Sequence, residues 1–320
     1  MSTASTTQNS NPTSSKAGRL ANQSRANAVN SFKLGRLARS HDPRIPQLQA
    51  LLAGKFLPTP SVQVDYTRNM PSNLGVMGND TLGDCTCAAF YHARQVWNYN
   101  APKSRATTPP TNGRATTAAA ALATAATTTP TAAPTAVLID EPAAVVELYQ
   151  QACGYNPSQA GEGPGGNEQQ VLTYLLNKGA PIGPNGAERQ RLSGFVELDV
   201  SNINSIKSTI QDCGVAYIGF NVPQFIIPPG NAPLPVWDVD AAADNTIIGG
   251  HAVVLAGYNS TGARVISWGQ YYTMTWAFFE RFVDEAYALI DADWVASTGR
   301  DPAGLSMQQL TQAMQALRQN

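Results

Sequence analysis

The chain has 320 residues, of which 43% are hydrophobic and only 13% charged, and its formal net charge is −1. This length allows one or two domains with a buried core, and the near-neutral charge excludes a chain that is basic or acidic throughout. The sequence contains no apolar run that could span a bilayer and no apolar core of a signal peptide near its start, so we expect a cytoplasmic protein without membrane contact.

The first 57 residues form a basic arm. They contain eight Lys and Arg residues and one acid, a charge of +7 that leaves −8 on the remainder. The first 30 residues are rich in Ser, Thr, Asn and Gln, and we predict that the arm over 1–57 is largely disordered. Two interpretations of its charge stay open: a solvated tail, or contact with an anionic partner such as nucleic acid, an anionic surface or the acidic remainder of the chain.

The body of the chain is expected over residues 58–300, and its first strong signal is a cysteine before a helix. Cys85 lies in the stretch GDCTCAAF (83–90), and a helix-forming run continues to Trp97. The positive end of a helix lowers the pKa of a thiol and so favours the nucleophilic thiolate. A small buried core residue is the alternative interpretation of this cysteine.

The composition changes after this helix. Residues 102–136 are almost entirely Ala, Thr and Pro, which cannot build a varied core, so we predict a surface insertion there. The elements predicted beyond it are helices over 141–151 and 166–177, a strand over 193–199, a helix over 203–213 capped by Asn202, strands over 215–222, 251–258 and 263–269, a short helix over 275–283 and a strand over 286–290. Helices in the first half and strands in the second predict an α+β domain.

The last segment, residues 301–320, is predicted to be an amphipathic tail. Leu310, Met314 and Leu317 recur at helical spacing, which favours a short helix packed on the body.

The strand over 251–258 carries the expected base for Cys85. The chain has only three histidines. His92 lies about two helical turns from Cys85, too far for a hydrogen bond, and His41 lies in the polar arm. His251 begins an apolar strand after two glycines that permit close backbone approach, which makes it the expected partner, with a structural strand histidine as the alternative.

These motifs resemble those of the papain-like cysteine peptidases. In that family an amide side chain six residues before the nucleophile contributes to the oxyanion hole, and Asn79 holds this offset in place of the usual glutamine. The family histidine occurs as His-Ala-Val before Gly-Tyr, as it does within 251–258. A second strand then carries Ser-Trp-Gly, found here at 267–269.

Two positions depart from the family pattern, and one of them is Thr86, which follows the nucleophile in place of the common tryptophan. The residue before Ser-Trp-Gly is usually an asparagine that orients the histidine, but here it is Ile266, whose side chain cannot hydrogen-bond an imidazole. Three alternatives stay open: Ser267 takes that role, Gln270 takes it, or the role is absent. Trp268 is expected to shield the histidine from water.

The resemblance implies a papain-like α+β fold, in which the N-terminal helix with Cys85 packs against a C-terminal antiparallel sheet with His251, and relatives among bacteria or phages. It implies a cysteine peptidase acting on peptide or protein substrates, with Asn79 in the oxyanion hole and Ser267 as the orienting residue. A catalytically inactive papain-like binding or structural module is one alternative, and an acyltransferase or amidase with the same Cys–His pair is another.

No cofactor or metal is expected, because the four cysteines match no zinc-site spacing. No propeptide is evident in the sequence, although residues 45–66 are placed where they could cover the cleft.

Overall fold

The computed structural model describes residues 32–55, 57–100, 142–183, 186–230, 233–299 and 304–318. The predicted insertion at 102–136 and the first 31 residues of the arm lie outside this described part. Within the described residues, no helix combines the length and the apolar character needed to cross a lipid bilayer.

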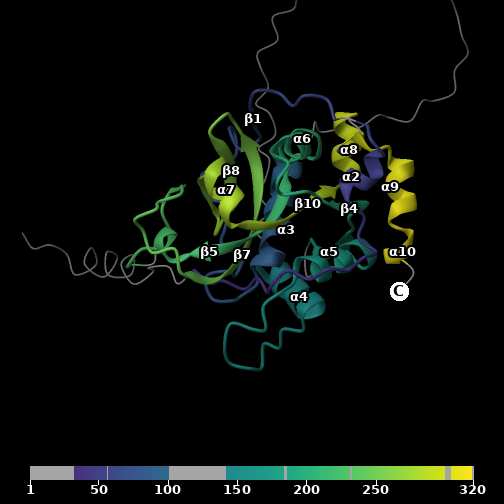
Figure 1. The fold of residues 1–320 in the computed structure, drawn as a ribbon. Coiled ribbons are helices and arrows are strands. Elements are labelled where there is room, and N and C mark those ends of the chain that lie inside the picture. The colour runs from purple at the N-terminus through teal and green to yellow at the C-terminus, as the bar shows by residue number, and fades with distance from the viewer. Residues whose placement is uncertain are drawn as a thin grey trace, which may run out of the picture.

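A large sheet forms the centre of the fold (Figure 1). Its strands are β1 (Val64–Asp65), β4 (Gly194–Glu197), β5 (Ala216–Pro223), β6 (Val236–Trp237), β7 (Ile247–Tyr258), β8 (Gly262–Ser267), β9 (Gln270–Thr275) and β10 (Val283–Ile290). Their order is β4-β10-β5-β7-β8-β9-β6, and β1 pairs with β7. The pairs are antiparallel except β6 with β9. A separate hairpin joins β2 (Ala180–Ile182) to β3 (Glu188–Gln190).

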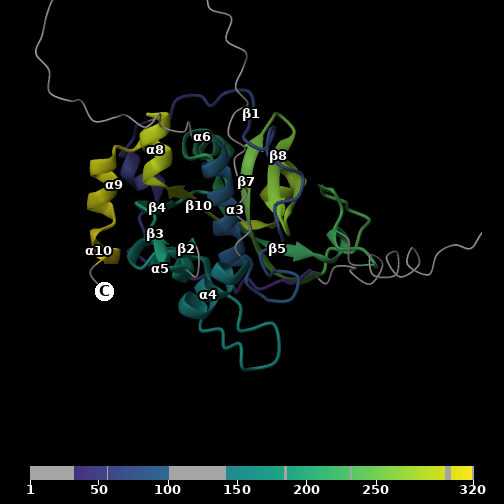
Figure 2. The same ribbon diagram turned by 180° about the vertical axis from the view of Figure 1, so that it is seen from behind.

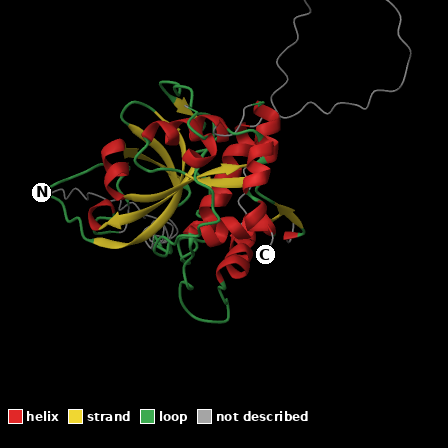
Figure 3. Ribbon diagram, turned by 45° about the vertical axis from the view of Figure 1, so that its right-hand side comes forward, coloured by secondary structure: helices red, strands yellow, loops and turns green. Residues whose placement is uncertain are grey.

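The helices complete the α+β architecture predicted from the sequence. They are α2 (Leu48–Leu52), α3 (Cys85–Asn100), α4 (Pro142–Cys153), α5 (Glu168–Asn177), α6 (Ile203–Cys213), α7 (Trp276–Phe282), α8 (Ala292–Thr298), α9 (Met307–Ala313), α10 (Gln315–Arg318) and the 3-10 helix η2 (Gln224–Ile226). Most helices lie toward one side of the molecule and most strands toward the other (Figure 3).

Helix α3 lies at the junction of the two halves. Its first 13 residues, from Cys85 to Trp97, are all buried, which is the pattern of a central helix rather than a surface helix. It packs against β7 and β8 (Figure 2). The Trp97 indole donates a hydrogen bond of 2.7 Å to the Cys213 carbonyl, which ties α3 to the end of α6.

Strands β5 and β7 form the middle of the sheet. Their register runs from Ala216 opposite Leu255 to Asn221 opposite Gly250, and it places Phe220 opposite His251. Most of the residues of β5 are buried regardless of which face they are on, so β5 is covered on both faces. His251 lies on β7, which pairs with β5 on one side and with β8 on the other.

The predicted helix over 203–213 is confirmed at both ends. The Asn202 side chain accepts a hydrogen bond from the Ser205 amide, and the helix stops at Gly214, whose φ is 82°. The tail forms two short helices, α9 and α10, rather than one, and it buries Leu310, Met314 and Leu317 as the helical spacing predicts.

The arm differs from its prediction in the part that the structure describes. Residues 32–55 pack on the body, where Ile45, Leu48 and Leu52 are buried in the core. We call residues 32–40 the strap, because they run as an extended chain between the start of α5 and strand β7 (purple in Figure 1). The prediction of disorder is therefore wrong for residues 32–55, because burial of these apolar side chains in the core stabilises the segment.

Candidate active site

Cys85 is the first residue of α3, and its side chain is closed off from water. The residue is 1% exposed, and the backbone amides of Gly35 and Ala252 hydrogen-bond its sulfur. Burial raises the pKa of the Cys85 thiol to about 12. At pH 8 about one molecule in 10⁴ would carry the thiolate, so this is the neutral form of the nucleophile.

His251 is held on β7 by two neighbours on the next strand and turn. Its Nε2 atom lies 2.7 Å from the Ser267 hydroxyl, and its Nδ1 atom has no hydrogen-bond partner among the described residues. The Trp268 ring stacks on the imidazole with 4.2 Å between centroids and 14° between planes. Burial lowers the pKa of His251 to about 3, so the ring is neutral in this state.

Cys85 and His251 come from distant parts of the sequence. The Ala252 amide that hydrogen-bonds the Cys85 sulfur belongs to the residue directly after His251. Among the described residues, no hydrogen bond joins the Cys85 and His251 side chains, and both groups are uncharged.

Asn79 lies in the loop that leads into α3. Its side chain is buried and donates a hydrogen bond of 2.9 Å to the Leu82 carbonyl, inside its own loop. The same amide lies beside the Asp84 carboxyl, whose pKa is raised because it is buried. The structure therefore places Asn79 next to the residue that precedes Cys85.

Of the two candidates for orienting the histidine, Ser267 makes the contact. Gln270 is exposed, and Ile266 is buried opposite Val254 on β7. Trp268 has a φ of 45° between Ser267 and Gly269, and this left-handed turn carries its ring back over His251.

Of the other two histidines, His92 lies close enough to His251 for its charge to help lower the pKa of that ring, after the larger effect of burial. His92 is buried within α3, and its Nδ1 lies 2.9 Å from the Gln95 side-chain oxygen. His41 is exposed in the arm.

The strap lies over Cys85 and is hydrogen-bonded to the helical half of the protein on one side and to the sheet on the other. On the helical side, Leu37 N donates to Gly166 O at 2.9 Å and Gly166 N donates to Gly35 O at 2.8 Å. On the sheet side, Arg36 N donates to Gly250 O at 3.1 Å. The strap therefore bridges the two walls in the manner of an added strand.

The contact of the strap with Cys85 depends on a glycine. A Cβ atom on Gly35 would lie 1.9 Å from the Gly83 carbonyl oxygen, well inside any allowed contact. The backbones of Gly35 and Gly83 can approach this closely only because neither residue has a side chain there.

Three basic side chains of the strap pair with acids of the body. Lys33 contacts Glu162 at 2.5 Å, and Arg39 pairs with Glu197. Arg36 is 6% exposed and enters a cluster of three carboxylates, described below. The possibility that the arm contacts the acidic remainder of the chain is realised for these three residues.

The sequence did not reveal the strap, and residues 45–66 were named instead as a segment that could cover the cleft. The sequence feature that could have indicated the strap is two Gly-Gly pairs, at 165–166 and 249–250. One pair lies on each side of the strap. A Cβ atom on Gly250 would lie 2.7 Å from the Arg36 carbonyl oxygen, and one on Gly165 would lie 2.6 Å from the Gly35 carbonyl oxygen. Both pairs mark places where a second backbone comes close.

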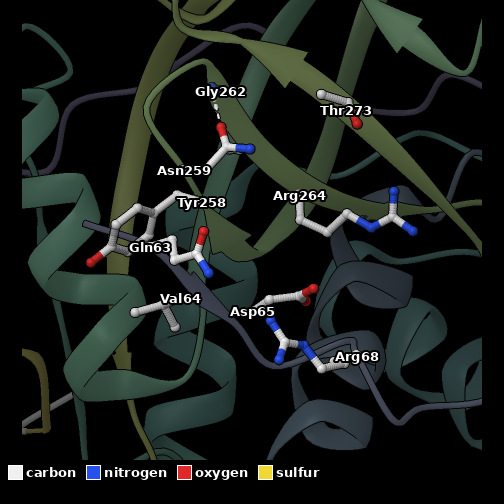
Figure 4. A pocket seen from close by; sticks show the side chains of 10 residues that line it. Gln63, Val64, Asp65, Arg68, Tyr258, Asn259, Gly262, Arg264 and Thr273 are labelled. Carbon is white, nitrogen blue, oxygen red and sulfur yellow. Dashed lines mark hydrogen bonds between the residues drawn. The ribbon is translucent and has the colours of Figure 1, made fainter. Parts of the chain in front are cut away.

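Two surface hollows lie outside the strap-covered region. One of about 740 Å³ lies beside Trp268, where Phe32 of the strap forms part of its lining. The other, of about 260 Å³, lies at the turn between β7 and β8, lined by Arg68, Asp65 and Arg264 among others (Figure 4). None of the predicted site residues lines the second hollow. Among the described residues, no group of three or more His, Cys, Asp and Glu side chains is arranged to hold a metal ion.

Comparison with known proteins identifies the architecture. No protein-family model and no curated protein matches the sequence. Among solved structures, xylellain, a cysteine protease from Xylella fastidiosa, matches with a TM-score of 0.54 and 13% identity over 82% of this chain and 97% of that chain.

Two further structures match less closely. Digestive procathepsin L 3 of Tenebrio molitor larval midgut has a TM-score of 0.47 and 13% identity over 84% of this chain and 78% of that chain. ProCathepsin B S9 from Trypanosoma congolense has a TM-score of 0.47 and 11% identity over 81% and 87%. The match to xylellain, together with a helix that carries Cys85 against a sheet that carries His251, shows that the chain has the papain-like fold.

Proposed function

We propose that this chain is a cysteine peptidase and that the strap holds it in a blocked state. The observation that carries the proposal is that the cleft already contains an extended peptide, the strap, hydrogen-bonded to Gly166 on one wall and Gly250 on the other. The Cys85 sulfur faces the backbone of that peptide at Gly35. A cleft of this form fits a polypeptide better than a compact small-molecule acyl donor.

The proposed chemistry follows from the two nitrogen atoms of His251. In the neutral tautomer with its proton on Nε2, the ring donates to Ser267 and leaves the Nδ1 lone pair available. Once the strap leaves and water enters, Nδ1 takes the thiol proton of Cys85. The thiolate attacks the peptide carbonyl carbon, and the Cys85 amide stabilises the oxyanion. The Asn79 amide joins it after giving up its hydrogen bond to the Leu82 carbonyl.

The covalent steps then balance. The C–N bond breaks as the imidazolium of His251 gives its proton to the departing amine, leaving a thioester on Cys85. A water molecule, deprotonated by His251, attacks the thioester carbon. The carboxylic acid leaves, and the thiol of Cys85 is restored.

The experiment removes the strap from the cleft in the full-length protein. Gly35→Ala introduces the clash with Gly83 and should expel the strap, whereas Ala38→Ser adds one atom to an exposed residue of the same strap and serves as the control. We expect Gly35→Ala to raise the rate of Cys85 alkylation by iodoacetamide at least 100-fold and to cleave an unfolded protein substrate. Ala38→Ser should behave as wild type.

Further substitutions test the assignment of the pair. In the Gly35→Ala background, Cys85→Ala and His251→Asn should abolish cleavage. Alkylated Cys85 without any peptide-bond cleavage in a folded Gly35→Ala protein would point to an inactive binding module, and transfer of the acyl group to an added amine in preference to water would point to an acyltransferase. If Gly35→Ala does not fold, as judged by circular dichroism, Phe32→Ala loosens the strap at its other contact, with Trp268.

A further inference from the structure

A buried pocket beside Cys85 holds the side chain of Arg36. Its walls are three carboxylates: Glu168 at the start of α5, and Asp284 and Glu285 on β10. The Arg36 side chain is 1% exposed, and those of Glu168 and Glu285 are both 0% exposed. Asp284, at 35%, stands at the mouth of the pocket.

The carboxylates meet the guanidinium along its whole edge. Arg36 Nε donates to Glu168 Oε1 at 2.6 Å and to Glu285 Oε1 at 3.1 Å. Nη2 donates to Asp284 Oδ1 at 2.5 Å and also to Glu285 Oε1. A planar fork of several N–H groups satisfies this arrangement, whereas a single ammonium group cannot reach the same acceptors.

The backbone around the pocket is shaped to form it. The register of β10 against β5 shifts between Val283 and Glu285, so Asp284 and Glu285, which would point to opposite faces of a regular strand, both reach the guanidinium. On β5, a Cβ atom at Gly219 would lie 2.1 Å from Glu168 Oε1 and 2.3 Å from Arg36 Nε. The missing side chain of Gly219 thus provides the space for the charged groups.

The pocket has more acceptor atoms than Arg36 uses, and burial together with the neighbouring Glu285 raises the pKa of Glu168. Three carboxylates face one guanidinium, and the buried Glu168 Oε2 has no hydrogen-bond partner among the described residues. The Tyr287 hydroxyl donates to Glu285 Oε2 at 2.7 Å and fixes that carboxylate whether or not Arg36 is present. When the strap leaves, two buried carboxylates lose their cation, and a new cation would relieve that cost.

The pocket also lies at the reacting centre. Gly219 is paired with Ala252, the residue whose amide hydrogen-bonds the Cys85 sulfur. The strap residue over Cys85 is Gly35, the immediate neighbour of Arg36. A peptide in the cleft would therefore place one of its side chains in this pocket while its backbone lay over the thiol.

We propose that the pocket formed by Glu168, Asp284, Glu285 and Gly219 recognises the arginine side chain of a peptide substrate, and that Arg36 of the strap occupies it in the blocked state. The claim that the arginine belongs to a substrate rests on the proposed peptidase function. The binding of an arginine side chain does not depend on catalysis and is tested separately.

The binding test uses the full-length Gly35→Ala protein, in which the pocket residues are unchanged. Its ligand is a synthetic peptide of residues 32–40 with arginine at the position of Arg36, compared with the same peptide carrying citrulline, which has the same shape without the charge, or lysine. The readout is protection of Cys85 from iodoacetamide. We expect the arginine peptide to protect at concentrations at least 100-fold below the citrulline peptide and at least 10-fold below the lysine peptide.

The substrate test scans one arginine or one citrulline through each position of an otherwise constant peptide. We expect one position at which arginine raises kcat/KM at least 100-fold over citrulline. Glu285→Gln and Gly219→Ala should lower this ratio to near 1, whereas Glu162→Gln, which removes an acid that pairs with the strap outside the pocket, should leave the ratio as it was. If Glu285→Gln does not fold, Asp284→Asn at the half-open mouth gives the same comparison with a smaller expected loss.

The outcomes separate the two proposals. Cleavage of arginine and citrulline peptides at equal rates overturns the arginine pocket and leaves the peptidase standing. Selective protection by the arginine strap peptide without cleavage of any peptide supports the pocket and overturns the peptidase. Selectivity for the strap peptide alone, with no arginine preference among cleaved peptides, shows that the pocket serves only the strap and overturns the inference.

Discussion

At the scale of single residues, the contact between His251 and Ser267 sets the orientation of the imidazole. The hydroxyl of Ser267 meets Nε2 at 2.7 Å, while the stacked ring of Trp268 covers one face of the imidazole. One short hydroxyl and one aromatic face thus hold the ring. We expect the stacking to keep the histidine in place even when the hydrogen bond is lost.

Ser267→Ala in the Gly35→Ala background should lower kcat/KM by about 10- to 100-fold, the effect of losing about 1–3 kcal/mol of hydrogen bonding in the transition state. The measurement is kcat/KM for peptide cleavage as a function of pH. Gln270→Ala is the control, since Gln270 is exposed, and it should change the rate less than about twofold. An equal loss in both variants would assign the orienting role elsewhere.

The sequence singles out Cys85 and His251 and narrows the orienting residue to Ser267 or Gln270, but it does not decide between these two. Cys85 and His251 stand in short motifs that a single chain displays, and His251 has few competitors because the chain has only three histidines. The choice between Ser267 and Gln270 depends on the left-handed backbone at Trp268, where φ is 45°. A positive φ at a residue other than glycine is uncommon, and nothing in the local sequence predicts it at Trp268.

At the scale of secondary-structure elements, local signals explain which predictions succeeded. Helix α6 has its own capping residue, its own apolar face and a terminal glycine, so its limits follow from neighbouring residues. The strap contains no such signal, because its hydrogen bonds go to residues 166 and 250, far away in the chain. Pairing across such separations is set by the assembled fold and not by local propensity.

The tail offers a test of element packing. Leu310 of α9 is 0% exposed, and a Cβ atom on Gly194 of β4 would lie 2.8 Å from its side chain. Leu310→Ala should lower the free energy of unfolding by about 2–5 kcal/mol, because it leaves a cavity between α9 and the edge of the sheet. Urea denaturation measures the change. Gln312→Ala on the exposed side of the same helix should stay within about 0.5 kcal/mol of wild type.

At the scale of the whole molecule, buried neutral histidines link stability to pH. Burial lowers the pKa of His92 from its ordinary value of 6.5 to about 4, so between these values the unfolded chain binds a proton that the folded chain does not. Stability due to this residue is therefore present above pH 6.5 and is lost as the pH falls toward 4.

The measurement is the difference in unfolding free energy between wild type and His92→Gln. When the pH falls from 7 to 4, wild type should lose roughly 3 kcal/mol more of its unfolding free energy than His92→Gln does. Taking the difference removes the contributions of buried acids such as Asp84, which act in the opposite direction. Gln312→Ala on the exposed side of α9, which removes no titratable group, is the control and should give a flat difference. A flat difference for His92→Gln as well would contradict the prediction.

The position of Trp268 beside the strap makes its fluorescence a reporter of whether the strap is bound. Its indole stacks on His251 on one side and contacts Phe32 of the strap at 4.7 Å between centroids, while its Nε1 donates to the Lys33 carbonyl at 3.4 Å. Departure of the strap would remove two of these three neighbours and admit water to the ring. The emission of this tryptophan should then shift to longer wavelength, so that rapid-mixing fluorescence can time the opening of the unlabelled protein.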